Sequence, residues 1–172
     1  MIISRFEKKS AQSAKSTRVE KIQHHKAHFA SILGEKKLWK SEKVLGVVWD
    51  GIGFGTSTEI WGGEFFLFEN QKMERVAQLE NFVWILGDKM SKTPKISALS
   101  VSRNNEDLKF AFDENEWKIY TNLIEKSEVK TSSMGRFFDA VAFVLGYEKP
   151  LFFEGEPAMW LEKISQEKFP TD

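Results

Sequence analysis

Residues 44–55 read VLGVVWDGIGFG, a continuous apolar run that leads into an aspartate and three glycines at alternate positions. An apolar run of this kind predicts a strand that is buried on both faces. Asp50 would then stand at the carboxyl end of the strand, where open α/β sheets place their ligand sites. The stretch therefore predicts an α/β fold with a binding site just after this strand.

The three glycines of the stretch, Gly51, Gly53 and Gly55, have two interpretations. Glycines let backbone amides approach a phosphate or a metal-bound oxyanion without obstruction by side chains, which favours a hairpin folded over a phosphate. A plain β-hairpin turn would require the same residues. The spacing is not the dinucleotide-binding fingerprint, because strand rather than helix is expected to follow.

Downstream of the glycines, residues 59–68 and 73–79 predict two more strands joined by the polar turn 69–72. Together with the first strand they would form a three-stranded meander. The paired glycines at 62 and 63 indicate a bulge or a close backbone approach. After the meander the pattern changes to helices, which we expect at 89–101, at 107–125 with breaks, from 132 to 145, and from Pro157 onward. In the third helix the expected apolar stripe comprises Met134, Phe137, Phe138, Val141, Ala142 and Leu145.

Upstream, the hexapeptide QHHKAH at residues 23–28 contains all three histidines of the chain. We expect a short strand at 19–23 and then a helix at 24–38 with the histidines in its first turn. On a helix His24 and His28 project from one face, close enough to hold one metal ion, whereas His25 lies on another side. An ordinary surface feature is the other interpretation of such a pair.

Length and composition limit the functional classes. The 172 residues fit a single domain or part of a larger one, and Lys plus Arg equals Asp plus Glu at 25 each. No overall charge therefore favours a nucleic acid or a membrane as partner. The absence of cysteine leaves only nitrogen and oxygen ligands for a metal and suits a cytoplasmic protein. Residues 1–18, rich in Lys, Ser and Ala, are expected to form a disordered lead-in.

Two pairs of residues later in the chain are further candidates for ligand binding. Arg136 and Asp139 are three residues apart on a predicted helix, so an intrahelical ion pair is the simple interpretation, and a contact to ribose or phosphate is the alternative. Glu154 and Gly155 precede the last helix, where the carboxylate suits a neutral sugar hydroxyl. The sequence contains no Gly-Lys-Ser/Thr phosphate loop, no His-Glu-x-x-His motif and no serine nucleophile elbow.

Four segments, in this order, resemble the HypF family, the carbamoyltransferases of hydrogenase maturation. They are QHHKAH at 23–28, DGIGFG at 50–55 with IWGGEF at 60–65, SSMGRFFDAV at 132–141, and FEGE at 153–156. Lys26 stands where the family has a histidine, residues 56–58 replace a frequent Asp-Gly pair, and Glu156-Pro157 replaces a usual Gln-Ala. None of these departures removes an expected metal ligand.

The resemblance implies a fold and a set of ligands. The fold is a partial actin-like ATPase fold of the ASKHA superfamily, similar to TsaD, with a three-stranded meander followed by helices. The metal ligands would be His24, His28 and Asp50, holding iron, manganese, magnesium or zinc. Asp139, Glu154 and Gly155, with the glycines of the hairpin, would bind the nucleotide or carbamoyl adenylate.

The resemblance also implies a reaction. Carbamoyl phosphate and ATP would form carbamoyl adenylate, and the carbamoyl group would pass to the C-terminal cysteine of a HypE-type acceptor protein. Residues 19–172 would be part of the domain that binds these substrates, with its C-terminal half and the other HypF segments supplied in cis or in trans. The alternatives are an inactive remnant or interaction module, and a carbamoyltransferase acting on a small molecule or tRNA.

Overall fold

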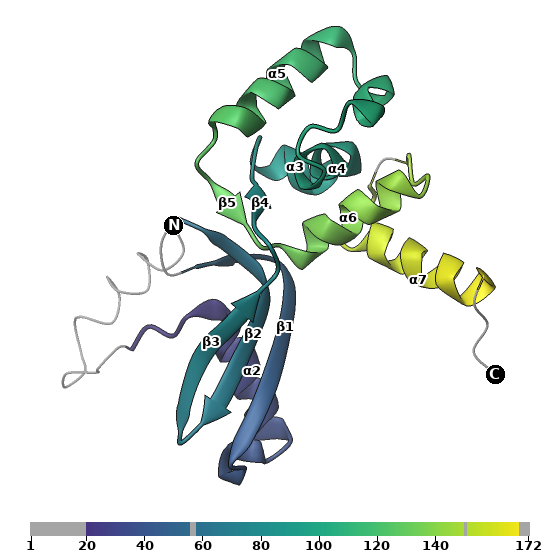
Figure 1. Ribbon diagram of the computed structural model, residues 1–172. Coiled ribbons are helices and arrows are strands. Elements are labelled where there is room, and N and C mark those ends of the chain that lie inside the picture. The colour runs from purple at the N-terminus through teal and green to yellow at the C-terminus, as the bar shows by residue number, and fades with distance from the viewer. Residues whose placement is uncertain (1–19, 56–57, 150, 169–172) are drawn as a thin grey trace, which may run out of the picture.

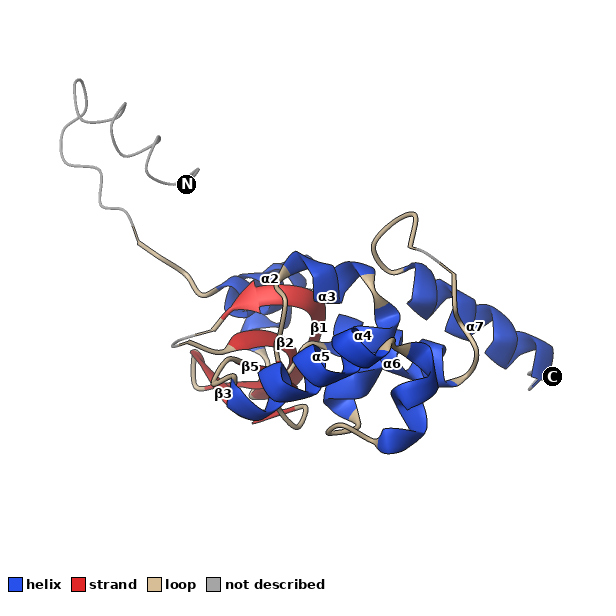
Figure 2. Cartoon of the chain, turned by 90° about the horizontal axis from the view of Figure 1, so that it is seen from above, coloured by secondary structure: helices blue, strands red, loops and turns tan. Residues whose placement is uncertain are grey.

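The computed structural model describes residues 20–55, 58–149 and 151–168, and it shows an α/β protein in which the three long strands and most of the helices occupy different ends (Figure 1). At one end, three long strands lie beside helix α2, and at the other end helices α3 to α7 pack together. Seen from above, helices α6 and α7 extend away from the strands (Figure 2). The disordered lead-in predicted for residues 1–18 lies outside the described residues.

The predicted meander is confirmed. Its strands are β1 (Lys43–Phe54), β2 (Ile60–Glu69) and β3 (Lys72–Gln78), and both successive pairs are antiparallel. Two short strands, β4 (Phe82–Val83) and β5 (Lys130–Thr131), complete a five-stranded sheet of order β1-β2-β5-β4, with β3 on β2. Because β5 pairs parallel to β2, the sheet is mixed.

Strand β1 differs from its prediction in two ways. Its exposure alternates: Gly46 and Val48 are buried, whereas Leu45, Val47 and Trp49 are 51–62% exposed, so only one face is covered. The predicted burial on both faces is therefore wrong for the described chain. The strand also continues through Gly51 and Gly53, since its pairing with β2 resumes at Gly53 after an irregularity that follows Trp49.

Helix α2 (His24–Glu35) covers the buried face of the meander (Figure 1). Phe29 and Leu33 from the helix form a cluster with Val48 of β1 and with Phe66 and Phe68 of β2. Gly46 allows this contact, because a Cβ there would collide with the Phe29 ring. A short 3-10 helix, η2 (Leu38–Lys40), replaces the predicted end of the helix, and residues 20–23 form no strand.

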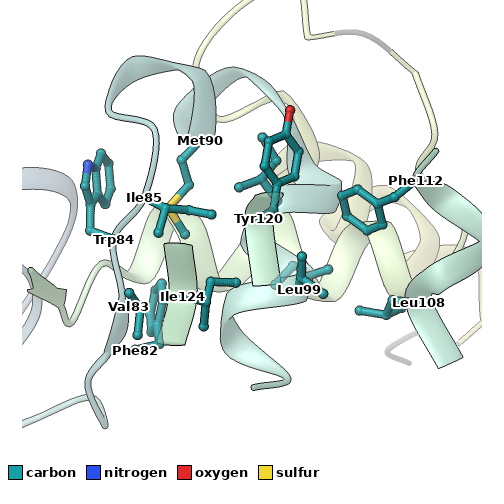
Figure 3. Packing of buried hydrophobic residues seen from close by; sticks show 13 residues of the cluster. Phe82, Val83, Trp84, Ile85, Met90, Leu99, Leu108, Phe112, Tyr120 and Ile124 are labelled. Atoms are coloured by element: carbon teal, nitrogen blue, oxygen red, sulfur yellow. The ribbon is translucent and has the colours of Figure 1, made fainter. Parts of the chain in front are cut away.

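The helical end has its own core, shown in Figure 3. Its elements are α3 (Asp88–Lys92), α4 (Pro94–Val101), the 3-10 helix η3 (Glu106–Ala111), α5 (Glu114–Lys126), α6 (Met134–Val144) and α7 (Glu156–Lys168). The predicted helix at 89–101 is broken at Pro94, which lacks the amide hydrogen that a continuous helix needs. The expected breaks in 107–125 fall between η3 and α5.

The buried face of helix α6 differs from the predicted apolar stripe. Met134 and Ala142 are buried as expected, but the other most buried residues are Arg136, Asp139 and Ala140. Leu145 lies just after the helix and is 57% exposed. The small residues of α6 pack against α4, and the charged side chains of Arg136 and Asp139 point into the protein. Apolar periodicity alone therefore misassigned part of the buried face of this helix.

Within the described ranges, no helix is both long and apolar enough to cross a membrane.

Candidate metal and nucleotide site

The first turn of α2 faces the end of β1, and this contact places the histidines. Gln23 caps the helix: its side-chain Oε1 accepts a hydrogen bond from Lys26 N at 2.9 Å. The prediction that the helix begins at His24 is confirmed, with His24 and His25 in the first turn and His28 at the start of the second. The cap was not predicted, and glutamine is an uncommon residue at this position.

Three of the predicted ligand atoms converge on one point. His24 Nε2 lies 2.9 Å from Asp50 Oδ2 and 3.1 Å from His28 Nε2, and His28 Nε2 lies 4.0 Å from Asp50 Oδ2. Ligands about 2.1 Å from one ion are separated by roughly 3.0–3.4 Å in octahedral or tetrahedral geometry. The three separations bracket that range, so the set fits a single divalent ion.

The hydrogens available to this cluster also favour a cation. A neutral His24 either carries a proton on Nε2 and donates it to Asp50, or keeps a lone pair there and accepts from His28. It cannot do both, although both neighbours lie within hydrogen-bond distance. A positive ion between the three atoms satisfies all of their lone pairs at once, and the set is open to solvent, with side chains 46%, 57% and 30% exposed for His24, His28 and Asp50.

Asp50 is held as an anion. Burial by itself raises the pKa of its carboxyl, but the hydrogen bond from His24 and the one from Gly51 N, 2.7 Å from Oδ1, outweigh burial and lower the pKa overall. A deprotonated carboxylate with one oxygen fixed by the backbone presents Oδ2 to the histidines. This is the state that metal binding requires.

His25 lies on another side of the helix from His24 and His28, as predicted, and it is fully buried there. Its Nε2 is still 3.9 Å from Asp50 Oδ2. Burial lowers its pKa, against the opposing effect of the Glu64 and Asp50 carboxylates. A buried imidazole with a lowered pKa is neutral at physiological pH.

Gly51, Gly53 and Gly55 make different contacts. A Cβ on Gly51 would lie 2.6 Å from Glu154 Oε1, so this glycine makes room for the carboxylate, whereas a Cβ on Gly53 would collide with the His25 ring. The amides of Gly51 and Gly55 already donate, to Asp50 Oδ1 and to Glu59 O at 3.1 Å. Phosphate binding by these glycines stays a prediction.

The structure also brings Glu154 next to Gly51, although the two are far apart in the sequence. Glu154 contributes to a cavity of about 320 Å³ whose other lining residues include Ile52, Asp88, Lys92 and Phe153. Gly155 has φ +83°, a conformation that favours glycine, directly before α7. The predicted sugar-binding turn therefore borders the same strand end as the metal ligands.

Ser133 connects α6 to this strand end and was not predicted as a contact residue. Its hydroxyl donates to Gly51 O at 2.5 Å and accepts from Arg136 N at 3.1 Å as the N-cap of α6. The helix was expected to begin at residue 132, and it begins at Met134 instead. Through Ser133 the first turn of α6 is fixed against the backbone that follows Asp50.

The Arg136–Asp139 ion pair is confirmed, with Arg136 Nε 2.6 Å from Asp139 Oδ2 and both side chains nearly fully buried. Arg136 Nη1 has no hydrogen-bond partner among the described residues. Burial raises the pKa of Asp139 to about 6, although Arg136 lowers it, and the Glu154 carboxylate adds to the rise. The ribose contact of Asp139 stays a prediction.

The raised pKa of Asp139 predicts a pH dependence of stability. The native carboxyl binds its proton more tightly than the unfolded one, whose pKa is 3.8, so the native state is stabilised at low pH and loses this contribution as the pH rises through about 6. Asp139→Asn carries no such proton. Between about pH 4 and pH 7, the free energy of unfolding of wild type should fall relative to that of Asp139→Asn by roughly 2 kcal/mol. Urea titrations across this range measure the difference, and parallel pH profiles for the two proteins would contradict it.

The chain is similar to known proteins. Residues 46–171 match the family model described as carbamoyltransferase, Kae1-like domain, second subdomain. The chain is 35% identical to the probable carbamoyltransferase HypF of Methanocaldococcus jannaschii, over 84% of this chain and 20% of that protein. It is 37% identical to HypF of Rhodobacter capsulatus, over 87% of this chain and 21% of that protein.

Two solved structures are similar as well. A full-length HypF in a phosphate- and nucleotide-bound form has a TM-score of 0.73 at 34% identity, covering 91% of this chain and 21% of that one. HypF of T. kodakarensis has a TM-score of 0.71 at 29% identity, covering 84% and 21%. The chain thus has the fold of part of a Kae1-like, actin-like domain.

This chain belongs to the HypF carbamoyltransferase family. It spans about a fifth of the length of these relatives.

Proposed function

We propose that this chain forms part of the catalytic domain of a carbamoyltransferase of [NiFe] hydrogenase maturation. The observation that carries the proposal is the convergence of His24, His28 and Asp50 on one point, beside Gly51 and Glu154, in a member of the HypF family. In the proposed reaction, ATP, carbamoyl phosphate and water yield carbamoyl adenylate with release of pyrophosphate and inorganic phosphate. The C-terminal cysteine thiol of a HypE-type acceptor then takes the carbamoyl group, and AMP leaves.

The metal site would be formed by His24 Nε2, His28 Nε2 and Asp50 Oδ2. A bound divalent ion, iron, manganese, magnesium or zinc, would supply Lewis acidity toward phosphate or carbamoyl oxygens. Three protein ligands leave coordination positions open for substrate, as in other catalytic metal sites. The hydrogen bond from Gly51 N keeps the Asp50 carboxylate directed at this point.

The nucleotide would lie on the Glu154 side of the strand end. Glu154 can accept hydrogen bonds from ribose hydroxyls, which are neutral donors, without the repulsion that a phosphate would meet. The adjoining cavity contains Phe153 and Ile52 as apolar surface and Lys92 as a positive charge. Positioning of the two substrates, rather than a covalent intermediate on this chain, would provide the rate enhancement.

The remaining HypF segments, supplied in cis or in trans, would complete this site. Among the described residues, β1 pairs only with β2, which leaves its other edge open there, and a groove of about 400 Å³ runs from that edge to His28 and Asp50. Leu45, Val47 and Trp49 on the outer face of β1 are more than half exposed. Such an apolar patch on an open edge strand favours a covering polypeptide, and that polypeptide would lie next to the metal ligands.

Reconstitution tests the proposal. A HypF protein from which the matching segment has been deleted is mixed with this chain, and carbamoyl-phosphate-dependent pyrophosphate release from ATP is measured, followed by mass analysis of a HypE-type acceptor. We expect activity only in the mixture, and its loss when this chain carries Asp50→Ala. A mixture without turnover, although the two parts bind each other, would overturn the catalytic role and favour an interaction module. Turnover without modification of the acceptor would redirect the proposal to another carbamoyl acceptor.

A further inference from the structure

His25 lies behind the proposed ligand set, in a pocket that fixes its ring. The side chain is fully buried, and its ring centroid lies 5.9 Å from that of Trp61. On the β1 side the ring packs so closely against Gly53 that a Cβ there would collide with it. His24 and His28, by contrast, are about half exposed. Among the three histidines, His25 is therefore the one whose position the fold determines.

The hydrogen bonds of Gln23 determine which nitrogen of His25 carries the proton. Gln23 Oε1 accepts from Lys26 N at 2.9 Å, so the opposite end of the amide must be the NH₂ group. That group lies 2.8 Å from Phe54 O and 3.0 Å from His25 Nδ1. It donates one hydrogen to each, and Nδ1 is therefore the acceptor. A neutral imidazole that accepts at Nδ1 carries its hydrogen on Nε2.

The resulting Nε2–H group is a buried donor without a partner. No acceptor among the described residues lies within hydrogen-bond distance of it. Asp50 Oδ2 is 3.9 Å away, which is within salt-bridge range but too long for a hydrogen bond. A movement of about 1 Å would bring the two atoms to hydrogen-bond distance. A buried donor that lacks its hydrogen bond is costly, so it favours any state that supplies one.

We propose that His25 is a positioning residue, whose Nε2–H donates to the Asp50 carboxylate when a metal ion is bound by His24, His28 and Asp50. The inference rests on the proposed metal site. Without the ion, His24 Nε2 is the hydrogen-bond partner of Asp50 Oδ2. When His24 turns its lone pair to an ion, Asp50 loses that donor, and His25 Nε2–H replaces it. Gln23, His25 and Asp50 then form a chain of hydrogen bonds that holds the carboxylate in place.

Such outer partners of metal ligands typically contribute 10- to 100-fold to metal affinity. Two substitutions separate the proposed donor from simple packing. In His25→Asn, the amide reaches the place of Nδ1 and preserves an acceptor for Gln23, but it removes the donor to Asp50. In His25→Gln, the longer side chain carries its NH₂ group to the place of Nε2. Both replace the ring by a primary amide, and the Gln side chain is one methylene group longer than that of Asn.

The experiment is a titration of the metal-free chain with Mn²⁺, followed by electron paramagnetic resonance of the free ion, for wild type and both variants. We expect His25→Asn to bind about 10- to 100-fold more weakly, and His25→Gln to stay within a few-fold of wild type. Equal weakening in both variants, or wild-type affinity in His25→Asn, would overturn the donor role. A wild-type chain that binds no Mn²⁺ would instead overturn the metal site, and the role of His25 with it.

A second measurement needs no variant and no metal. Long-range ¹H–¹⁵N correlation spectra of the metal-free chain distinguish the two imidazole tautomers, and we expect His25 as the Nε2–H form. A spectrum with the proton on Nδ1 would overturn the inference even if the variants fail to fold. A packing role alone would not fix the tautomer.

Discussion

His24→Ala and Asp50→Ala are each expected to weaken divalent metal binding by more than about 100-fold. Each substitution removes one of three ligand atoms that lie within 4.8 Å of one another. Even partners outside the first coordination shell are worth 10- to 100-fold in affinity, so a direct ligand is worth more. Metal content after dialysis, measured by elemental analysis, and titration calorimetry provide the check.

Ser31→Ala is the matched control for this prediction. Ser31 lies on the same helix, is exposed, and follows His28 by less than one turn. Its replacement should leave metal affinity within a factor of two of wild type. Unchanged metal content in His24→Ala and Asp50→Ala would show that the ion, if one is bound, is held elsewhere.

Glu64→Ala is expected to have the largest effect on stability, a loss of about 3–5 kcal/mol in the free energy of unfolding. Glu64 is fully buried on β2. Its carboxylate pairs with Arg75 of β3 and accepts from Ser132 Oγ at 2.5 Å, as well as from the amides of Gly62 and Gly63 at 3.1 and 3.3 Å. Removing it leaves these donors without their acceptor. Denaturant titration at neutral pH measures the loss.

The control for Glu64 is Glu74→Ala, on the exposed surface of β3. A surface substitution of this kind should change stability by less than about 0.5 kcal/mol. If Glu64→Ala were as mild as Glu74→Ala, the buried carboxylate would not be what holds β2, β3 and the segment before α6 together.

The meander and the start of α2 could be predicted because their signals are local. Alternating and apolar runs separated by polar turns specify antiparallel strands, and the His24–His28 spacing specifies one face of a helix. The exposure of one face of β1 could not be predicted, because an apolar run has the same composition whether one face or both are covered. Only the structure shows that Leu45, Val47 and Trp49 are more than half exposed.

Contacts between distant segments were also beyond sequence reasoning. Nothing in the residues around Gly51 indicates that Glu154 lies against it, or that Ser133 donates to its carbonyl. His25 was assigned to another side of the helix by periodicity alone. That direction was correct, but it is also the direction of β1, where Asp50 Oδ2 lies 3.9 Å from His25 Nε2.

The most direct test of the account is a crystal of the chain grown with Mn²⁺ and measured near the manganese absorption edge. The account predicts one anomalous peak about 2.0–2.3 Å from His24 Nε2, His28 Nε2 and an Asp50 carboxylate oxygen. A strong peak that does not touch these three residues, or no peak at saturating Mn²⁺, would contradict it.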